Sequence, residues 1–203
     1  MKIALIGASG NVGSRILAEA LRRGHTVSAI VRHPEKLAAQ KGVTALRGDL
    51  NAPAELAPLL RGHDAVISSV RFVDADPRKL CDAVKAGGVR RLLVVGGAGS
   101  LEVAPGVQLV DAPDFPDAYR PEASAGRDFL AALRRERELE WTFLSPSVMF
   151  APGERTGRFR LGGDQLLTDP AGKSWISMED YAIALLDELE TPRHVRRRFT
   201  VGY

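Results

Sequence analysis

The sequence of 203 residues has one cysteine, few aromatic residues and no long apolar run. Because Cys81 is the single cysteine, the chain cannot form an internal disulfide, which fits a reducing cytoplasm. No apolar stretch approaches the roughly 20 residues that a membrane-spanning helix needs, and we expect no secretory leader before the first apolar run. We therefore expect a cytoplasmic protein that does not associate with a membrane, with Cys81 as a buried, small apolar side chain.

A strong excess of charge of one sign is also missing. The net charge of +3 is too small to indicate a nucleic-acid partner. A basic cluster formed by Arg193, Arg196, Arg197 and Arg198 has no interleaved aromatic residues, so we expect it to be a solvated surface. The four histidines do not have the spacing of metal ligands, and no metal site is predicted. These absences leave a small-molecule ligand and a monomer or homodimer as the expectation.

The most informative segment present is the opening, MKIALIGASGNVG. An apolar run leads into three glycines and then into a helical pattern, which is the order of a dinucleotide-binding turn. In such a turn Gly7 permits the tight bend, Gly10 lets the backbone approach a pyrophosphate, and Gly13 lets the helix pack on the sheet. The alternative is a strand-to-helix turn without a ligand. The cofactor contacts predicted here are Gly7, Ser9, Gly10, Asn11, Val12 and Gly13.

Apolar runs alternate with helical patterns along most of the chain. This alternation predicts a Rossmann-type α/β fold, a doubly wound parallel sheet with helices on both faces, in one domain spanning residues 1–203. A segment rich in proline and aspartate, residues 100–120, is expected to be a long loop. The expected strands are 2–6, 25–31, 43–47, 65–69, 91–95, 141–144 and 199–201. The expected helices are 12–23, a short one from Pro34, 53–60 started by Asn51, 77–86, 124–137 and 179–189.

The end of the second strand bears on the choice between NAD and NADP. NAD-binding proteins usually place an acid here to hold the ribose, whereas this chain has Arg32. A guanidinium presents a planar set of donors that suits a 2′-phosphate, so we expect NADP(H) to be favoured over NAD(H). The alternative for Arg32 is an ordinary surface position.

Further cofactor contacts are expected beyond the ends of the other strands, because ligands of this fold lie there. For Asp49 the alternative to a cofactor contact is a role as a turn or helix-cap residue. After the fifth strand, VVGGAGS brings Ser100 to the place where a reductase positions a polar group near the nicotinamide, with a glycine turn alone as the alternative. The predicted cofactor contacts are Asp49, Leu50, Ser68, Ser69, Val70, Gly97, Ser145 and Pro146.

The segments GASGNVG, VRHPEKL, GDL, VVGGAGS, WTFLSP, PGERTGRFRLG and SMEDYAIALLDELE together resemble the atypical short-chain dehydrogenase/reductase family. Within that family the chain is most similar to the branch of NAD(P)H-flavin reductases, which is related to biliverdin reductase B and to NmrA-like proteins. The resemblance covers nearly the whole chain. It implies a Rossmann core with a small substrate-side region around residues 146–175.

One departure from the wider superfamily matters. That superfamily uses a Tyr-x-x-x-Lys pair, in which the lysine lowers the pKa of the tyrosine. Here Tyr119 is followed four residues later by Ala123. An unassisted phenol, with a pKa of about 10, is a poor general acid at neutral pH. This disfavours interconversion of alcohols and carbonyls, whereas hydride transfer to a flavin does not need that acid.

The substrate-side region is expected to contact a flat acceptor. Aromatic side chains stack on flat rings, and an arginine pairs with a flavin phosphate. We therefore expect Phe115, Phe150 and Arg155 to contact the substrate. The alternatives are a core position for Phe150 and Trp175, and a solvated loop for Arg155 and the arginines that follow it.

Three functions are compatible with these residues. The leading one is an NADP(H)-dependent reductase of FMN, riboflavin or a quinone by direct hydride transfer. The second is a non-catalytic sensor that binds NADP(H) and reports redox state to a partner protein. The third is a reductase or isomerase of a specific small metabolite, with Ser100 or Tyr119 as the catalytic proton donor.

Overall fold

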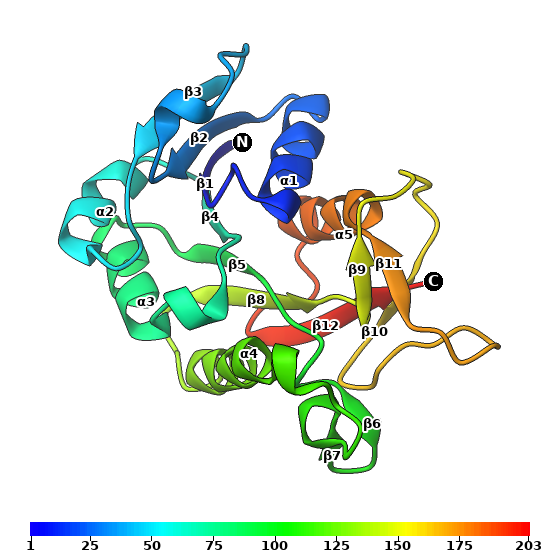
Figure 1. The fold of residues 1–203 in the computed structure, drawn as a ribbon. Coiled ribbons are helices and arrows are strands. Elements are labelled where there is room, and N and C mark those ends of the chain that lie inside the picture. Colours follow the sequence, from blue (N-terminus) through cyan, green and yellow to red (C-terminus); the bar gives the residue numbers. More distant parts are fainter.

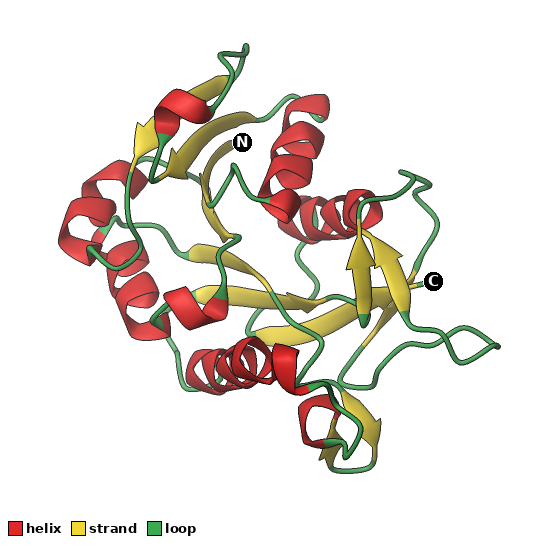
Figure 2. Ribbon diagram, in the orientation of Figure 1, coloured by secondary structure: helices red, strands yellow, loops and turns green.

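The computed structural model describes residues 1–203, which fold around an eight-stranded sheet (Figures 1 and 2). The strand order is β10-β12-β8-β5-β4-β1-β2-β3, and all neighbours pair in parallel except β10 with β12. The predicted Rossmann-type α/β fold is thereby confirmed. The strands are β1 (Lys2–Ile6), β2 (Thr26–Val31), β3 (Val43–Arg47), β4 (Ala65–Ser68), β5 (Arg91–Val95), β8 (Glu140–Ser145), β10 (Arg160–Gly162) and β12 (Arg197–Gly202).

The direction of the strand order reverses between β1 and β4. From β1 the chain runs outward through β2 to β3, then returns to β4 and continues through β5 and β8 to β12. At such a switch point the loops that leave the two strands diverge to opposite faces and open a crevice beyond the carboxyl ends. The segments that follow β1 and β4 therefore border the place where folds of this kind take their ligands.

The strands of the sheet centre are buried because helices cover both faces. In β1, Ile3 and Leu5 join one core cluster with α1 and α5, while Ala4 and Ile6 join a second cluster with α2, α3 and α4. This division follows from the two-residue period of a strand, which sends alternate side chains to opposite faces. The helices are α1 (Asn11–Arg22), α2 (Pro53–Leu60), α3 (Pro77–Ala86), α4 (Arg120–Leu133) and α5 (Met178–Glu190).

Helix starts are set by local capping, and one predicted cap is wrong. Asp76 accepts the Arg78 N–H at 2.8 Å at the start of α3, and Ser177 accepts the Asp180 N–H at 3.0 Å at the start of α5. Asn51, by contrast, does not cap α2. Its side-chain amide donates instead to the Asp74 carbonyl at 3.0 Å. The Asn51 side chain is therefore held by a tertiary contact to the segment after β4, although the local sequence pattern predicts it as the cap of α2.

The segment 100–120 is not the structureless loop expected from its prolines. It contains a small antiparallel hairpin and two 3-10 turns, which project from the end of β5 beside α4 (Figure 1). Leu101 and Val110 anchor this segment because both are almost fully buried. Helix α4 also begins and ends four residues earlier than the predicted 124–137. The elements are β6 (Glu102–Ala104), β7 (Val107–Gln108), η3 (Leu109–Asp111) and η4 (Asp117–Tyr119).

Residues 146–175 contain β10, which belongs to the main sheet, and most of a second, two-stranded ribbon. Here β9 (Met149–Ala151) pairs in parallel with β11 (Trp175–Ser177), and this ribbon lies next to α5 (Figure 1). Phe150 faces the core, with its ring centroid 4.7 Å from that of Tyr181. The Trp175 ring packs at a tilt against Tyr203, with 4.2 Å between the ring centroids, and stays 42% exposed, so the core position that was the alternative for it is not found.

The basic cluster of the last strand is not uniformly solvated as predicted. The Arg198 side chain is only 2% exposed and forms an ion pair with Asp164. Because β12 alternates its side chains, Arg198 points into the protein where its neighbour Arg197 is exposed. Cys81 is buried as expected, and burial raises the pKa of its thiol to about 12. None of the helices has the length and apolar character that crossing a bilayer requires.

Candidate cofactor-binding site

Two of the three glycines in the first turn are required by contacts within the protein. Gly7 has a φ of +83°, and a Cβ there would lie 2.2 Å from the Ser69 carbonyl oxygen. A Cβ on Gly13 would lie 2.1 Å from the Gly7 carbonyl oxygen. Gly10 differs, because an added Cβ would meet no protein atom closer than 3.4 Å and its φ of −73° suits any residue. The space above Gly10 is open, as close approach of a pyrophosphate to the backbone requires.

The start of α1 has the properties of an anion site. No side chain caps this helix, and its first turn contains no acid. The backbone N–H groups of Asn11, Val12 and Gly13 have no protein acceptor. Unpaired N–H groups at a helix N-terminus, together with the positive end of the helix dipole, favour a phosphate. The residues present therefore fit the phosphates of a dinucleotide.

A groove beside this turn brings together most of the predicted contacts on the adenosine side. Its walls come from the ends of β1, β2 and β4 and from the segment after β3. Asn11, Val12, Gly13 and Ser68 are not part of its lining, and Ser68 is only 2% exposed. The predicted residues that line the groove are Gly7, Ser9, Gly10, Arg32, Asp49, Leu50, Ser69 and Val70.

Arg32 is the free cation of this groove. Its side chain is exposed and takes part in no hydrogen bond or ion pair. Asp49 both lines the groove and forms a turn, because its carboxylate accepts the Asn51 N–H at 2.8 Å. One oxygen of the Asp49 carboxylate already accepts a hydrogen bond, whereas the Arg32 guanidinium has all its donors available.

Three polar side chains of the lining were missed from the sequence, namely Asn51, Arg71 and Asp74. Arg71 and Asp74 belong to the turn after β4, which is held from α4 by Glu122. That carboxylate accepts the Phe72 N–H at 2.7 Å and the Val73 N–H at 3.2 Å. The only sequence signal was the position of Arg71 directly after Ser68-Ser69-Val70. The fold brings this second arginine into the groove from a turn distant in sequence from Arg32.

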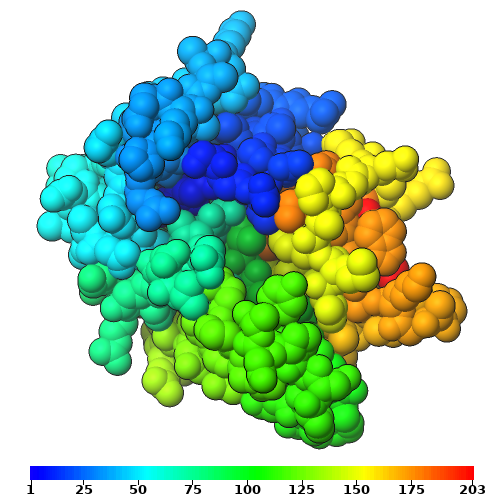
Figure 3. Space-filling view, viewed as in Figure 1, coloured from blue at the N-terminus to red at the C-terminus, as the bar shows by residue number.

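The other half of the crevice lies over the ends of β5 and β8. Figure 3 shows the surface hollowed here, between the blue N-terminal turn, the bright green segment that leads into α4 and the yellow segment that follows β8. Gly97 lies at the end of β5, where a Cβ would meet only the Phe72 ring at 3.5 Å. Tyr119 is 68% exposed, and Ala123 packs directly against Gly99. A tyrosine–lysine pair is therefore absent in the structure as well as in the sequence.

Ser100 and Ser145 are brought close together but are deeply placed. Ser145 is fully buried and Ser100 is 5% exposed, and Pro146 is buried beside them. Both hydroxyl oxygens contact the guanidinium of Arg198, at 3.5 Å for Ser100 and 3.3 Å for Ser145. This arginine is another residue that the sequence did not reveal, since it lies in the basic cluster predicted to be solvated.

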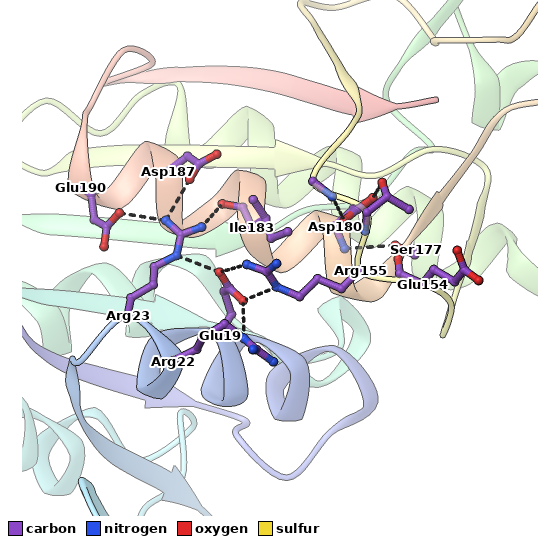
Figure 4. A network of polar contacts seen from close by, with 12 residues as sticks. Glu19, Arg22, Arg23, Glu154, Arg155, Ser177, Asp180, Ile183, Asp187 and Glu190 are labelled. Atoms are coloured by element: carbon purple, nitrogen blue, oxygen red, sulfur yellow. Dashed lines mark hydrogen bonds and ion pairs between the residues drawn. The ribbon is translucent and has the colours of Figure 1, made fainter.

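The three predicted substrate residues are not brought together. Phe115 lies under the Arg120 guanidinium at 5.5 Å, in the segment before α4. Phe150 packs against Tyr181 of α5. Arg155 donates two hydrogen bonds of 2.9 Å to the Glu19 carboxylate, across the outer side of α1 (Figure 4). Each of these side chains therefore has a partner in a different part of the protein.

The Arg155 contact belongs to a network that joins α1, α5 and the segment after β9 (Figure 4). Glu19, only 4% exposed, also accepts from Arg23 Nε at 2.9 Å, and Arg23 reaches Asp187 of α5 at 2.8 Å. Burial raises the pKa of the Glu19 carboxyl, but the hydrogen bonds from Arg155 and Arg23 outweigh burial and leave that pKa lowered. Asp180 at the start of α5 accepts the N–H groups of residues 156 and 157. The network fixes the helix that begins at the glycine turn.

The crevice, the glycine turn and the uncapped helix together define a nucleotide-binding α/β domain. The profile of the NAD(P)H-binding family matches residues 7–192, so the chain belongs to that family. This confirms the expected relation to the atypical short-chain dehydrogenases/reductases.

Several known proteins are similar over the full length. The uncharacterized protein YwnB of Bacillus subtilis is 44% identical, over 99% of this chain and 98% of its own. A structure of a candidate epimerase from Bacteroides thetaiotaomicron is 46% identical with a TM-score of 0.95, covering 100% of this chain and 96% of its own. A candidate NADH-flavin reductase from Streptococcus pneumoniae is 39% identical with a TM-score of 0.84, covering 100% and 99%. These relatives share one fold under different functional descriptions.

Proposed function

We propose that the protein is an NADP(H)-dependent reductase that passes a hydride to a flat conjugated acceptor, such as FMN, riboflavin or a quinone. The observation that carries the cofactor preference is Arg32, a free guanidinium in the adenosine-side groove at the position where NAD-binding proteins place an acid. Arg71 lines the same groove, with its Nε 3.8 Å from the Glu122 carboxylate. A 2′-phosphate beside Arg32 would gain charge-assisted hydrogen bonds that a 2′-hydroxyl cannot make.

The kind of acceptor follows from what the crevice lacks. Tyr119 has no lysine partner and is exposed, so it is not an assisted phenol of the kind that protonates an alkoxide. A bound nicotinamide supplies a hydride, and a flavin or quinone takes its proton from solvent. The residues at the ends of β5 and β8 then have only to hold two rings face to face and prevent competing reactions with water. The relative from Streptococcus pneumoniae, described as a candidate NADH-flavin reductase, supports this assignment.

A second candidate function is a reductase or epimerase of one specific metabolite. Its support is the similarity to the candidate epimerase from Bacteroides thetaiotaomicron and the position of Ser100 near the end of β5. This function requires Ser100 as a proton donor and predicts a narrow substrate range. The flavin function predicts a broad range of flat acceptors.

The test is a fluorescence titration of the protein with NADPH and with NADH, followed by addition of FMN or a quinone in the same cuvette. Tighter binding of NADPH, with its oxidation dependent on the acceptor, is the expected result. Tight NADPH binding with no turnover on any flavin or quinone would overturn the reductase proposal. In that case a change in partner affinity between NADP⁺ and NADPH would identify a redox sensor.

A further inference from the structure

A buried arginine supports the serines at the nicotinamide end of the crevice. Arg198 lies on β12 with its side chain 2% exposed, and its charge is balanced by Asp164, which accepts from Nε at 2.8 Å. Nη1 contacts Ser100 Oγ at 3.5 Å and Ser145 Oγ at 3.3 Å, and Nη2 contacts the Ser100 carbonyl at 3.4 Å. These distances are longer than ideal hydrogen bonds, so the guanidinium acts on both oxygens mainly through its charge.

Neither serine hydroxyl gives its proton to an acceptor in the protein. A guanidinium carries donors only, so Arg198 occupies a lone pair on each oxygen and leaves each O–H bond free to donate. Ser100 Oγ has no other hydrogen-bond contact, and the second contact of Ser145 is made by its backbone carbonyl with Thr200. A buried hydroxyl whose proton has no acceptor is costly to maintain. For Ser100, which is 5% exposed, the proton is accounted for if a ligand supplies the acceptor.

The opposite end of the sheet offers a comparison. Arg91, at the start of β5, is also buried and donates to Thr142 Oγ1 at 2.7 Å. That hydroxyl passes its own proton on to the His194 carbonyl at 2.9 Å, so the chain of donors ends within the protein. The Arg198 network has the same kind of cation and hydroxyl but lacks the final acceptor, and it lies where the crevice opens.

We propose that Arg198 is a positioning residue that directs the hydroxyl of Ser100 to donate a hydrogen bond to a carbonyl oxygen of the ligand bound over the ends of β5 and β8. Ser145 is fully enclosed, so its role is to hold the guanidinium, whereas 5% of the Ser100 surface stays exposed. The positive charge strengthens the O–H group as a donor. This inference rests on the proposed function, because the carboxamide of a nicotinamide and the carbonyl of a flavin or quinone both offer such an oxygen.

The experiment compares Ser100→Ala with the wild type in two arms. The first arm measures dissociation constants for NADPH and for 2′-phospho-ADP-ribose, which lacks the nicotinamide. The second arm measures kcat and KM for FMN with NADPH saturating. If the acceptor oxygen is the carboxamide, S100A weakens NADPH about 5-fold and leaves the fragment unchanged. If it belongs to the acceptor, NADPH binding is kept and kcat falls by a similar factor with little change in KM.

Arg198→Lys tests the positioning role, because an ammonium keeps the charge but cannot span two serines and Asp164. We expect R198K to show the same selective loss of NADPH affinity or of kcat as S100A. Combining R198K with S100A should cause no further loss. Arg91→Lys is the matched control, with an expected loss of stability but an unchanged ratio of NADPH to fragment affinity. Should R198K not unfold cooperatively, Asp164→Asn replaces it, since it loosens the guanidinium without removing it.

The outcomes separate the two proposals. A wild type that binds NADPH but reduces no acceptor refutes the reductase function, and the binding arm then decides the inference alone. The inference is overturned if S100A matches the wild type in both arms, or weakens NADPH and the fragment equally. It is also overturned if the effect of R198K persists undiminished in the S100A background.

Discussion

Ala123 of α4 packs so closely against Gly99 that a Cβ on Gly99 would lie 2.8 Å from the Cβ of Ala123. The position four residues after Tyr119 is thereby used for packing the helix onto the turn after β5. A long charged side chain at this contact would have to leave the interface, so the structure gives a physical reason for the missing lysine.

This contact predicts coupling between the two residues. Gly99→Ala should lower the free energy of unfolding by about 1–3 kcal/mol, because its new Cβ forces α4 outward. Ala123→Gly in the same chain should recover part of that loss, although the Ala123 backbone also lies within 3.2 Å. Urea denaturation of the two single variants and the double variant measures the coupling. Simple additivity of the two changes would contradict the close packing.

Arg32→Ala should weaken NADPH far more than NADH. The loss of one or two charge-assisted hydrogen bonds to a 2′-phosphate corresponds to about 2 kcal/mol, or roughly 30-fold in the dissociation constant. Arg47→Ala is the matched control, since Arg47 is an exposed arginine on β3 outside the groove lining. Fluorescence titration of each variant with both cofactors gives the ratio of the NADPH and NADH dissociation constants. Equal weakening of NADPH and NADH by R32A would refute a 2′-phosphate contact.

Gly10→Ala and Gly13→Ala should separate binding from folding. The Cβ of G10A has open space around it, so the free energy of unfolding should change by less than about 1 kcal/mol while NADPH binding falls at least tenfold. The Cβ of G13A would lie 2.1 Å from the Gly7 carbonyl oxygen, so that variant should be strongly destabilised. Thermal unfolding and NADPH titration on both variants check this. Normal NADPH affinity in G10A would show that no ligand approaches this turn.

The Glu19 network predicts a pH-dependent contribution to stability. The pKa of Glu19 is lowered from its ordinary value of 4.5, so its folded form binds a proton less readily than its unfolded form. The stabilisation is therefore complete above pH 4.5 and is lost as the pH falls through the lower folded pKa. Glu19→Gln should destabilise the protein at pH 7, by about 2–3 kcal/mol after allowing for the partial exposure of Arg155, and the difference should shrink in acid.

Denaturant unfolding of E19Q and wild type between pH 3 and pH 7 tests this dependence. Glu55→Gln serves as the control, since Glu55 is exposed on α2 and takes part in no ion pair. If the difference in the free energy of unfolding between E19Q and wild type stays constant across this range, the ionised carboxylate is not what stabilises the network.

Most of the fold was predictable because its signals are local. The apolar runs and the glycine turn each depend on a few neighbouring residues, and the strands and helices they predict were found within a few positions. Asn51 and residues 100–120 were misread for the opposite reason. The first is held by the Asp74 carbonyl from the turn after β4, and the second is ordered by the burial of Leu101 and Val110. Contacts across the fold decided both, and no local pattern carries them.

The sequence by itself determined the class of the protein, since a strand, a glycine turn and a helix specify a nucleotide site through backbone geometry that lies within about a dozen residues. Arg32 and the absent lysine were also visible there, because each is one residue at one motif position. Only the tertiary structure decided which side chains share the crevice. It brought Arg71 into the groove, withdrew Arg155 to Glu19, and placed Arg198 beneath Ser100 across 98 residues of chain. Such pairings depend on strand order and burial, which are properties of the whole sheet.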